Sequence, residues 1–178
     1  MTNKIDRGLV QIFTGEGKGK TTAALGTVLR AAGHDLKVSV IFFIKGNYSH
    51  GEYKTLLALP GVQVKAYGLR KFIMENGKPN PKEVEQAKAA LAAAREDITG
   101  GKYDLVILDE VNCASFFQLI DPEDILQLIK DKPKHVELIL TGRNANKKVM
   151  AAADLVTEMK KIKHPFDKGI EARKGIEF

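Results

Sequence analysis

The chain has 178 residues, of which 44% are hydrophobic and 28% are charged, so it can bury a core as one domain over residues 1–178 without disulfides or metal ions. Its single cysteine, Cys113, excludes a disulfide framework, and no apolar run approaches the ~20 residues of a membrane helix, so we expect a cytoplasmic protein. The net charge of +6 favours anionic partners such as nucleotides, whereas the lack of Trp and of aromatic residues among the lysines argues against nucleic-acid binding.

Apolar, β-branched runs alternate with helical patterns along the chain. The first of these runs is followed by a predicted helix at residues 21–32. Continuous apolar strands separated by helices predict a doubly wound α/β fold, with a mostly parallel sheet of about six strands and helices on both faces. The strands are expected at residues 9–14, 38–44, 62–67, 105–108 and 136–141, with a possible sixth at 155–157.

A second helix is predicted at residues 81–99. Asn80 can cap it, Pro81 suits its first position, and Glu83 completes a pattern typical of a capping box. Glycines at 100 and 101 end it. One apolar stripe, which we interpret as core packing, runs through Val84, Ala87, Leu91, Ala94 and Ile98. The segments at residues 46–51 and 68–80 look irregular and follow the carboxyl ends of strands, where doubly wound sheets bind ligands.

A glycine-rich segment between the first strand and the first helix predicts a phosphate loop like that of P-loop NTPases. Its glycines let backbone N–H groups converge on phosphate oxygens, and the helix adds its positive N-terminal end. Lys20 supplies a cation for the terminal phosphates, and the Thr21 hydroxyl can ligate Mg²⁺. The usual first glycine is replaced by threonine. The predicted ATP-binding residues here are Thr14, Gly15, Glu16, Gly17, Lys18, Gly19, Lys20, Thr21 and Thr22.

Four apolar residues at 105–108 run directly into Asp109 and Glu110. An acid at the end of a buried strand beside a phosphate loop is the usual second half of a nucleotide site. We therefore predict that Thr21, Asp109 and Glu110 hold Mg²⁺, and that Lys20, Thr21 and Glu110 are the catalytic residues. Read alone, an acidic pair after a strand is often only a solvated strand end.

The wider sequence resembles the ATP:corrinoid adenosyltransferases of cobalamin biosynthesis, from its first strand to its last residues. The resemblance is carried by GLVQIFTGEGKGKTTAALGTVLRAAGH (8–34), FIKG (43–46), GE (51–52), LVILDE (105–110), LTGR (140–143) and DLVTEMKKIKHPFDKGIEARKGIEF (154–178). It implies transfer of the 5′-deoxyadenosyl group of ATP to the reduced cobalt of a corrinoid, cob(I)alamin or cobyrinate a,c-diamide, with triphosphate as leaving group. It also implies a homodimer and a reduced flavoprotein as electron donor.

The resemblance assigns further residues. It links Arg30 to the nucleotide, and Arg143 can contact phosphate or a corrinoid side chain, although both arginines can also be read as surface ion-pair partners. Glu16 stands where the family commonly has asparagine, so we expect its carboxylate to point away from phosphate or to meet the metal. Phe72, with Met74 in place of the family's tryptophan, is the expected corrinoid-binding wedge; Phe72 can alternatively pack against the domain.

Two other functions fit the same nucleotide site. One is a P-loop ATPase or kinase, in which Glu110 would orient a water or an acceptor hydroxyl. The other is a non-enzymatic module that uses ATP as a switch. The released phosphates separate the first from an adenosyltransferase, because triphosphate would be replaced by ADP and phosphate. The four histidines are scattered without triad or metal-ligand spacing, which fits a reaction in which Co(I) is itself the nucleophile.

Overall fold

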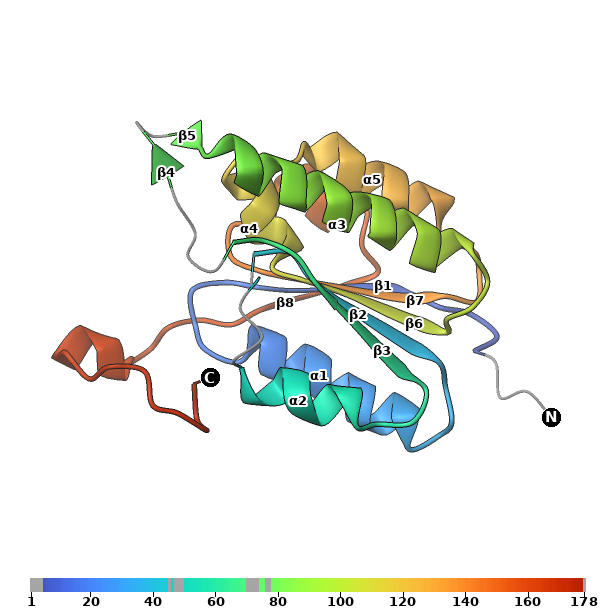
Figure 1. The fold of residues 1–178 in the computed structure, drawn as a ribbon, viewed down its shortest axis with the longest axis horizontal. Helices are drawn as coiled ribbons and strands as arrows, with labels where there is room; N and C mark the ends of the chain where they lie inside the picture. Colours follow the sequence, from blue (N-terminus) through green and yellow to red (C-terminus); the bar gives the residue numbers. More distant parts are fainter. Residues whose placement is uncertain (1–4, 45, 47–49, 70–73, 76–77, 178) are drawn as a thin grey trace.

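A computed structural model describes residues 5–44, 46, 50–69, 74–75 and 78–177 of the chain. A sheet of six parallel strands crosses the middle of the molecule, in the order β3-β2-β6-β7-β1-β8 (Figure 1). The predicted parallel α/β sheet is therefore confirmed. The strands are β1 (Val10–Thr14), β2 (Val38–Phe42), β3 (Val62–Ala66), β6 (Leu105–Asp109), β7 (Glu137–Thr141) and β8 (Leu155–Glu158).

Helices cover both faces of this sheet (Figure 1). On one face lie α1 (Lys20–Ala32) and α2 (Gly51–Leu57); on the other lie α3 (Pro81–Thr99), α4 (Val111–Phe116), α5 (Pro122–Asp131) and α6 (Lys147–Ala151). Within the described part of the chain, no helix is both long and apolar enough to cross a membrane.

Two apolar clusters, one on each face, hold the layers together. In β6, Leu105 and Ile107 face α1, whereas Val106 and Leu108 face α3, as the alternation of side chains along a strand requires. All four side chains are buried, which explains why the strand reads as a continuous apolar run.

Helix α3 has the predicted bounds, and the side chain of Asn80 caps it by accepting a bond from Lys82 N at 2.9 Å. The predicted capping box is wrong. The buried Glu83 carboxylate instead accepts a 3.4 Å bond from Leu69 N, on the segment that follows β3. The stripe through Ala87, Ala94 and Ile98 packs in the core as predicted.

The segments expected to be irregular contain short elements. Helix α2 begins at Gly51, and a two-stranded antiparallel pair, β4 (Met74–Glu75) and β5 (Lys78–Pro79), precedes α3. After β8 the chain continues through a 3₁₀ turn, η1 (Pro165–Lys168), and its last described residues return to the side of α1 and α2 (Figure 1). This return brings the C-terminal segment next to the predicted phosphate loop.

Candidate nucleotide site

The loop between β1 and α1 has the backbone shape that its glycines predict. Gly15 and Gly19 adopt φ values of 96° and 118°, a left-handed region that favours glycine. A Cβ at Gly15 would lie 2.6 Å from the carbonyl oxygen of Met159, and Gly17 N donates a 2.6 Å hydrogen bond to that same oxygen. The loop therefore rests on the backbone that follows β8, which leaves no room for a side chain beneath it.

Lys20, the first residue of α1, folds back into the curve of the loop. Its ammonium donates 2.8 Å hydrogen bonds to the carbonyl oxygens of Gly15 and Gly17, and the residue is only 8% exposed. Burial, reinforced by the nearby Arg143 charge, lowers the pKa of Lys20 below its ordinary value. Among the described residues no carboxylate bonds to this buried ammonium, so it gains from the arrival of an anion.

Thr21 and Asp109 meet at the adjacent edge of the sheet, as predicted for two halves of one site. Thr21 Oγ1 donates to Asp109 Oδ1 at 2.8 Å, and Thr141 Oγ1 donates to the same oxygen at 2.6 Å. Glu110 N in turn donates to Thr141 Oγ1 at 2.9 Å, and Glu110 has a left-handed φ of 61°. Asp109 is fully buried, whereas the Glu110 side chain lines the cavity described below.

Arg143 and Glu16 form an ion pair, with 3.2 Å between Arg143 Nη1 and Glu16 Oε2. This pairing accounts for a carboxylate in a phosphate loop, because its charge is partly balanced by an arginine from the end of β7. Both side chains are more than half exposed, so the pair is weak and open to exchange with an anion. Arg143 N also donates to Cys113 Sγ at 3.2 Å.

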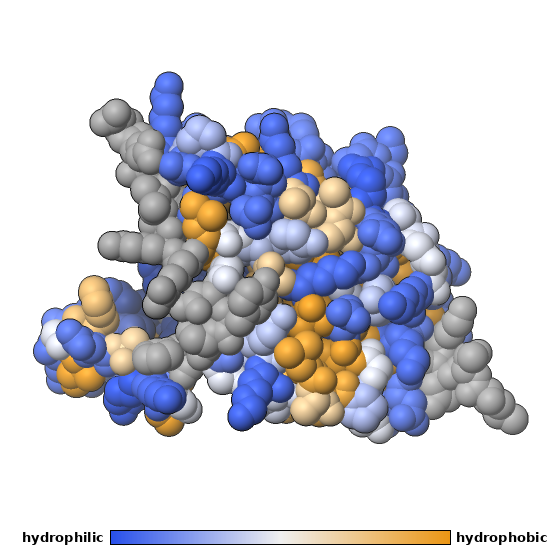
Figure 2. Space-filling view, in the orientation of Figure 1, coloured by the Kyte–Doolittle hydropathy of each residue, from blue (hydrophilic) through white to orange (hydrophobic). Residues whose placement is uncertain are grey.

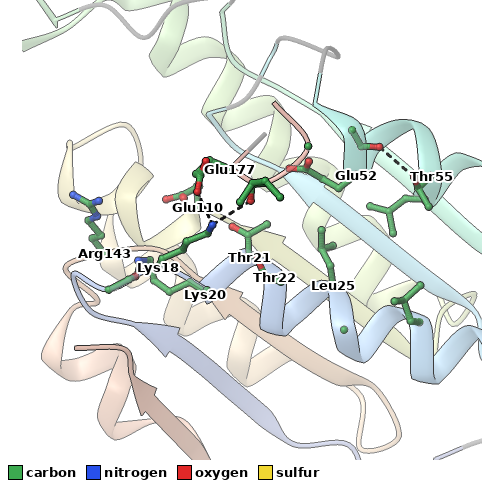
Figure 3. A pocket seen from close by; sticks show the side chains of 18 of the residues that line it. Lys18, Lys20, Thr21, Thr22, Leu25, Glu52, Thr55, Glu110, Arg143 and Glu177 are labelled. Atoms are coloured by element: carbon green, nitrogen blue, oxygen red, sulfur yellow. Dashed lines mark hydrogen bonds and ion pairs between the residues drawn. The ribbon is translucent and has the colours of Figure 1, made fainter. Parts of the chain in front are cut away.

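A cavity of about 720 Å³ opens over the loop (Figure 3). Its polar part is formed by the loop, Glu110 and Arg143, and its apolar part by Leu25 and Leu29 of α1 together with Leu56 of α2. This combination of a phosphate-binding end and an apolar end suits a nucleotide. Of the predicted ATP-binding residues, those that line it are Glu16, Gly17, Lys18, Gly19, Lys20, Thr21, Thr22 and Arg143.

The remaining predicted site residues lie elsewhere. Arg30 is exposed in the last turn of α1 and does not line the cavity; ten residues of helix place it about 15 Å from Lys20 along the axis. Neither Thr14, which is buried, nor Gly15, which packs against the backbone of Met159, lines the cavity. Phe72 lies outside the described residues, and Met74 is described only through its backbone in β4.

Sequence reasoning missed several residues of this site. Thr141 is the last residue of the fifth predicted strand and shares Asp109 with Thr21, but a threonine at a strand end carries no local signal. Helix α2 supplies Glu52 and Thr55 to the cavity wall, and the C-terminal segment supplies Gly175, Ile176 and Glu177. Figure 3 shows Glu177 directly beside Lys18, although 159 positions separate them in the chain.

Comparisons with solved structures support the fold alone. The chain matches a KaiC-like protein from Pyrococcus horikoshii with a TM-score of 0.58 and 14% identity, covering 89% of this chain and 75% of that one. It matches the ATPase 2 and 3 region of EssC from Geobacillus thermodenitrificans with a TM-score of 0.50 and 16% identity, covering 94% and 35% of the two chains.

Comparisons of sequence identify the family. A corrinoid adenosyltransferase from Sinorhizobium sp is 37% identical over all of this chain and 84% of its own length. Corrinoid adenosyltransferases from Escherichia coli K12 and, under the name CobA, from Salmonella typhimurium are each 35% identical over 97% of this chain and 87% of theirs. The family model described as ATP:corrinoid adenosyltransferase BtuR/CobO/CobP matches residues 6–178. The chain therefore belongs to the ATP:corrinoid adenosyltransferase family.

Proposed function

We propose that this protein transfers the 5′-deoxyadenosyl group of ATP to the reduced cobalt of a corrinoid, cob(I)alamin or cobyrinate a,c-diamide, and releases triphosphate. The observation that carries the proposal is the match of the family model to residues 6–178, a range that includes the phosphate loop lining the cavity. A P-loop ATPase or kinase is not favoured, because every relative named above as similar in sequence is a corrinoid adenosyltransferase.

The reaction requires the protein to stabilise the triphosphate leaving group and to position C5′ of ATP. Co(I) attacks C5′ of ATP, the cobalt–carbon bond forms, and the C5′–oxygen bond breaks with its electron pair going to the triphosphate. Lys20 and the loop N–H groups stabilise the charge that develops on that triphosphate. The cavity walls hold the nucleoside so that C5′ faces the corrinoid. No general base is needed, since the nucleophile has no proton to lose.

We propose that Mg²⁺ accompanies the triphosphate, held by Thr21, Asp109 and Glu110. One hydroxyl and two carboxylates, completed by phosphate oxygens and water, are the donor set that Mg²⁺ prefers. Among the described residues no group of three or more histidine, cysteine, aspartate or glutamate side chains is poised to hold a metal. When bound, Mg²⁺ neutralises charge on the triphosphate.

The corrinoid side of the proposal rests on the family. Phe72 and Met74 are proposed to contact the corrinoid and to exclude the lower axial ligand, which makes Co(II) easier to reduce. A reduced flavoprotein is the proposed donor of that electron. Arg30 and Thr14 remain proposed nucleotide residues, although neither lines the cavity.

A homodimer in the cytoplasm is proposed as the working form. The C-terminal segment exposes large apolar side chains, among them Ile162 at 85% and Phe166 at 75%, and Figure 2 shows apolar surface on this projecting segment. Exposed apolar side chains gathered on one segment support contact with another protein surface, and a second copy is the proposed partner.

Double labelling tests the proposed function. ATP carrying ¹⁴C in adenine and ³²P at the γ position is incubated anaerobically with the protein, Mg²⁺ and chemically reduced cobalamin. We expect the ¹⁴C to move to the corrinoid while the ³²P leaves as triphosphate. With all ¹⁴C in ADP, release of ³²P as orthophosphate would instead assign the protein to the ATPases, and ³²P on another acceptor would assign it to the kinases.

A further inference from the structure

The turn at residues 173–177 is here called the C-terminal turn. We propose that the carboxylate of Glu177, in this turn, competes with the triphosphate for Lys18. The inference rests on one part of the proposed function, which is that the loop binds a triphosphate. It assigns Glu177 as a residue that sets the affinity of the site for phosphates.

The Glu177 carboxylate is held as a phosphate group would be. Lys18 Nζ lies 2.9 Å from Glu177 Oε1 and also donates to the Ile176 carbonyl oxygen at 3.1 Å. The Arg173 guanidinium donates to both carboxylate oxygens, from Nη2 to Oε1 at 3.0 Å and from Nε to Oε2 at 3.2 Å. Its backbone N also donates to Oε2, at 2.7 Å. The carboxylate therefore sits between two cations, one of which belongs to the phosphate loop.

The C-terminal turn is a formed element next to the nucleotide cavity. Ile176 N and Glu177 N both donate to the Arg173 carbonyl oxygen, at 3.1 and 2.9 Å, and Gly175 adopts a left-handed φ of 80°. Gly175, Ile176 and Glu177 all line the cavity over the loop. The bonds from Arg173, with those from Lys18, hold the pKa of Glu177 well below its usual range, so the carboxylate stays charged at neutral pH.

A triphosphate and this carboxylate cannot both hold Lys18 well. Lys18 lies between Gly17 and Gly19, within the loop whose backbone amides surround the phosphates of a bound nucleotide. The Lys18 side chain is 48% exposed, and an ion pair of this kind contributes little. A triphosphate carries several negative charges, so it forms the stronger ion pair with Lys18 and repels the Glu177 carboxylate. Release of the triphosphate lets the carboxylate return.

Binding of inorganic triphosphate tests the competition without relying on adenosyl transfer. Glu177→Gln keeps the shape of the side chain and removes its charge. Glu171→Gln is the matched control, since Glu171 is an exposed carboxylate on the same segment with no ion pair among the described residues. Calorimetry with Mg²⁺ and triphosphate should give about two- to fivefold tighter binding for Glu177→Gln, the range of an exposed pair, and no change for Glu171→Gln.

Unchanged or weaker binding by a folded Glu177→Gln protein would overturn the inference, and thermal melting verifies folding. Limited trypsin digestion supplies an independent readout in the unaltered protein. Triphosphate should speed cleavage after Arg173 and Lys174, relative to cleavage after Lys134 at the opposite edge of the sheet. Protection of those bonds would make the C-terminal turn a lid and contradict the proposal. Both assays remain valid if adenosyl transfer itself is not observed, so the two failures are distinguishable.

Discussion

Thr21 Oγ1 donates a 2.8 Å hydrogen bond to Asp109 Oδ1, which joins the first turn of α1 to the end of β6 across 88 positions of sequence. The bond links the phosphate loop to the acidic strand end, the two motifs that define the site. It also holds the Thr21 hydroxyl and the Asp109 carboxylate together where Mg²⁺ would need both.

Asp109→Asn should remove the magnesium dependence of ATP binding. The amide keeps the size of the side chain but lacks the negative charge that a divalent cation requires. Saturation at about 100 times Kd stabilises a protein by about 2.7 kcal/mol, so the effect is measurable as a melting shift. We expect the difference between Mg·ATP and ATP with EDTA to vanish in this variant and to persist in Glu85→Gln, an exposed change on α3. A retained magnesium increment would exclude Asp109 from the metal site.

Lys20→Ala should slow turnover strongly while leaving the fold intact. Among the described residues, Lys20 donates hydrogen bonds only to the carbonyl oxygens of Gly15 and Gly17, and burial lowers its pKa, so the fold loses little when its charge is removed. The triphosphate, by contrast, loses its nearest buried cation. We expect kcat/KM to fall by about 10²–10³, as for removal of one charge-stabilising donor. Circular dichroism gives the folding control, and normal turnover by folded Lys20→Ala would refute this role.

Two glycines in the same region should respond oppositely to alanine. At Gly15 the positive φ costs about 1–2 kcal/mol for a residue with a Cβ, and that Cβ would also meet Met159 O at 2.6 Å. At Gly26, inside α1, an added Cβ meets nothing within 4 Å, so alanine should stabilise by up to about 1 kcal/mol. Urea unfolding without ligand measures both changes. Equal effects of the two substitutions would contradict the described loop geometry.

Cys113 should be unreactive in the native protein despite its place beside the site. Burial, then the Glu110 charge, raises the pKa of its thiol to about 12. The thiolate is the reactive form, so only about one thiol in 10⁴ is ionised at pH 8, and alkylation should quicken about tenfold per pH unit. Glu110→Gln removes a negative charge that raises this pKa, so it should speed alkylation at fixed pH. An unchanged rate would show that Glu110 does not face the thiol.

Sequence reasoning predicted the elements whose signals are local. Runs of apolar residues predict the six strands and α1. Proline at the start and glycine at the end predict the bounds of α3. The sequence predicts the loop and Asp109 as parts of one site because an acid at the end of a buried strand beside a phosphate loop is the usual second half of a nucleotide site. The structure brings these two parts into contact through the Thr21–Asp109 bond.

The missed features depend on contacts between distant positions. The residues around Glu177 do not indicate its ion pair with Lys18. The residues around Thr141 do not indicate that it donates to the same Asp109 oxygen as Thr21. Glu83 matched a capping pattern locally, but a contact with Leu69 after β3 determines where its carboxylate lies. Arg30 stays a prediction that rests on the resemblance; it does not line the cavity, whereas its neighbour Leu29 does, because successive residues of a helix point in different directions.

A single anaerobic assay with Mg·ATP and chemically reduced cobalamin tests the central claim most directly, with the corrinoid spectrum and the phosphate products followed together. We expect a light-sensitive alkylcobalt product and one triphosphate for each corrinoid converted, both formed about 10²–10³ times more slowly by Lys20→Ala. An unchanged corrinoid spectrum, with ADP and phosphate accumulating, would contradict adenosyl transfer while leaving the nucleotide site in place.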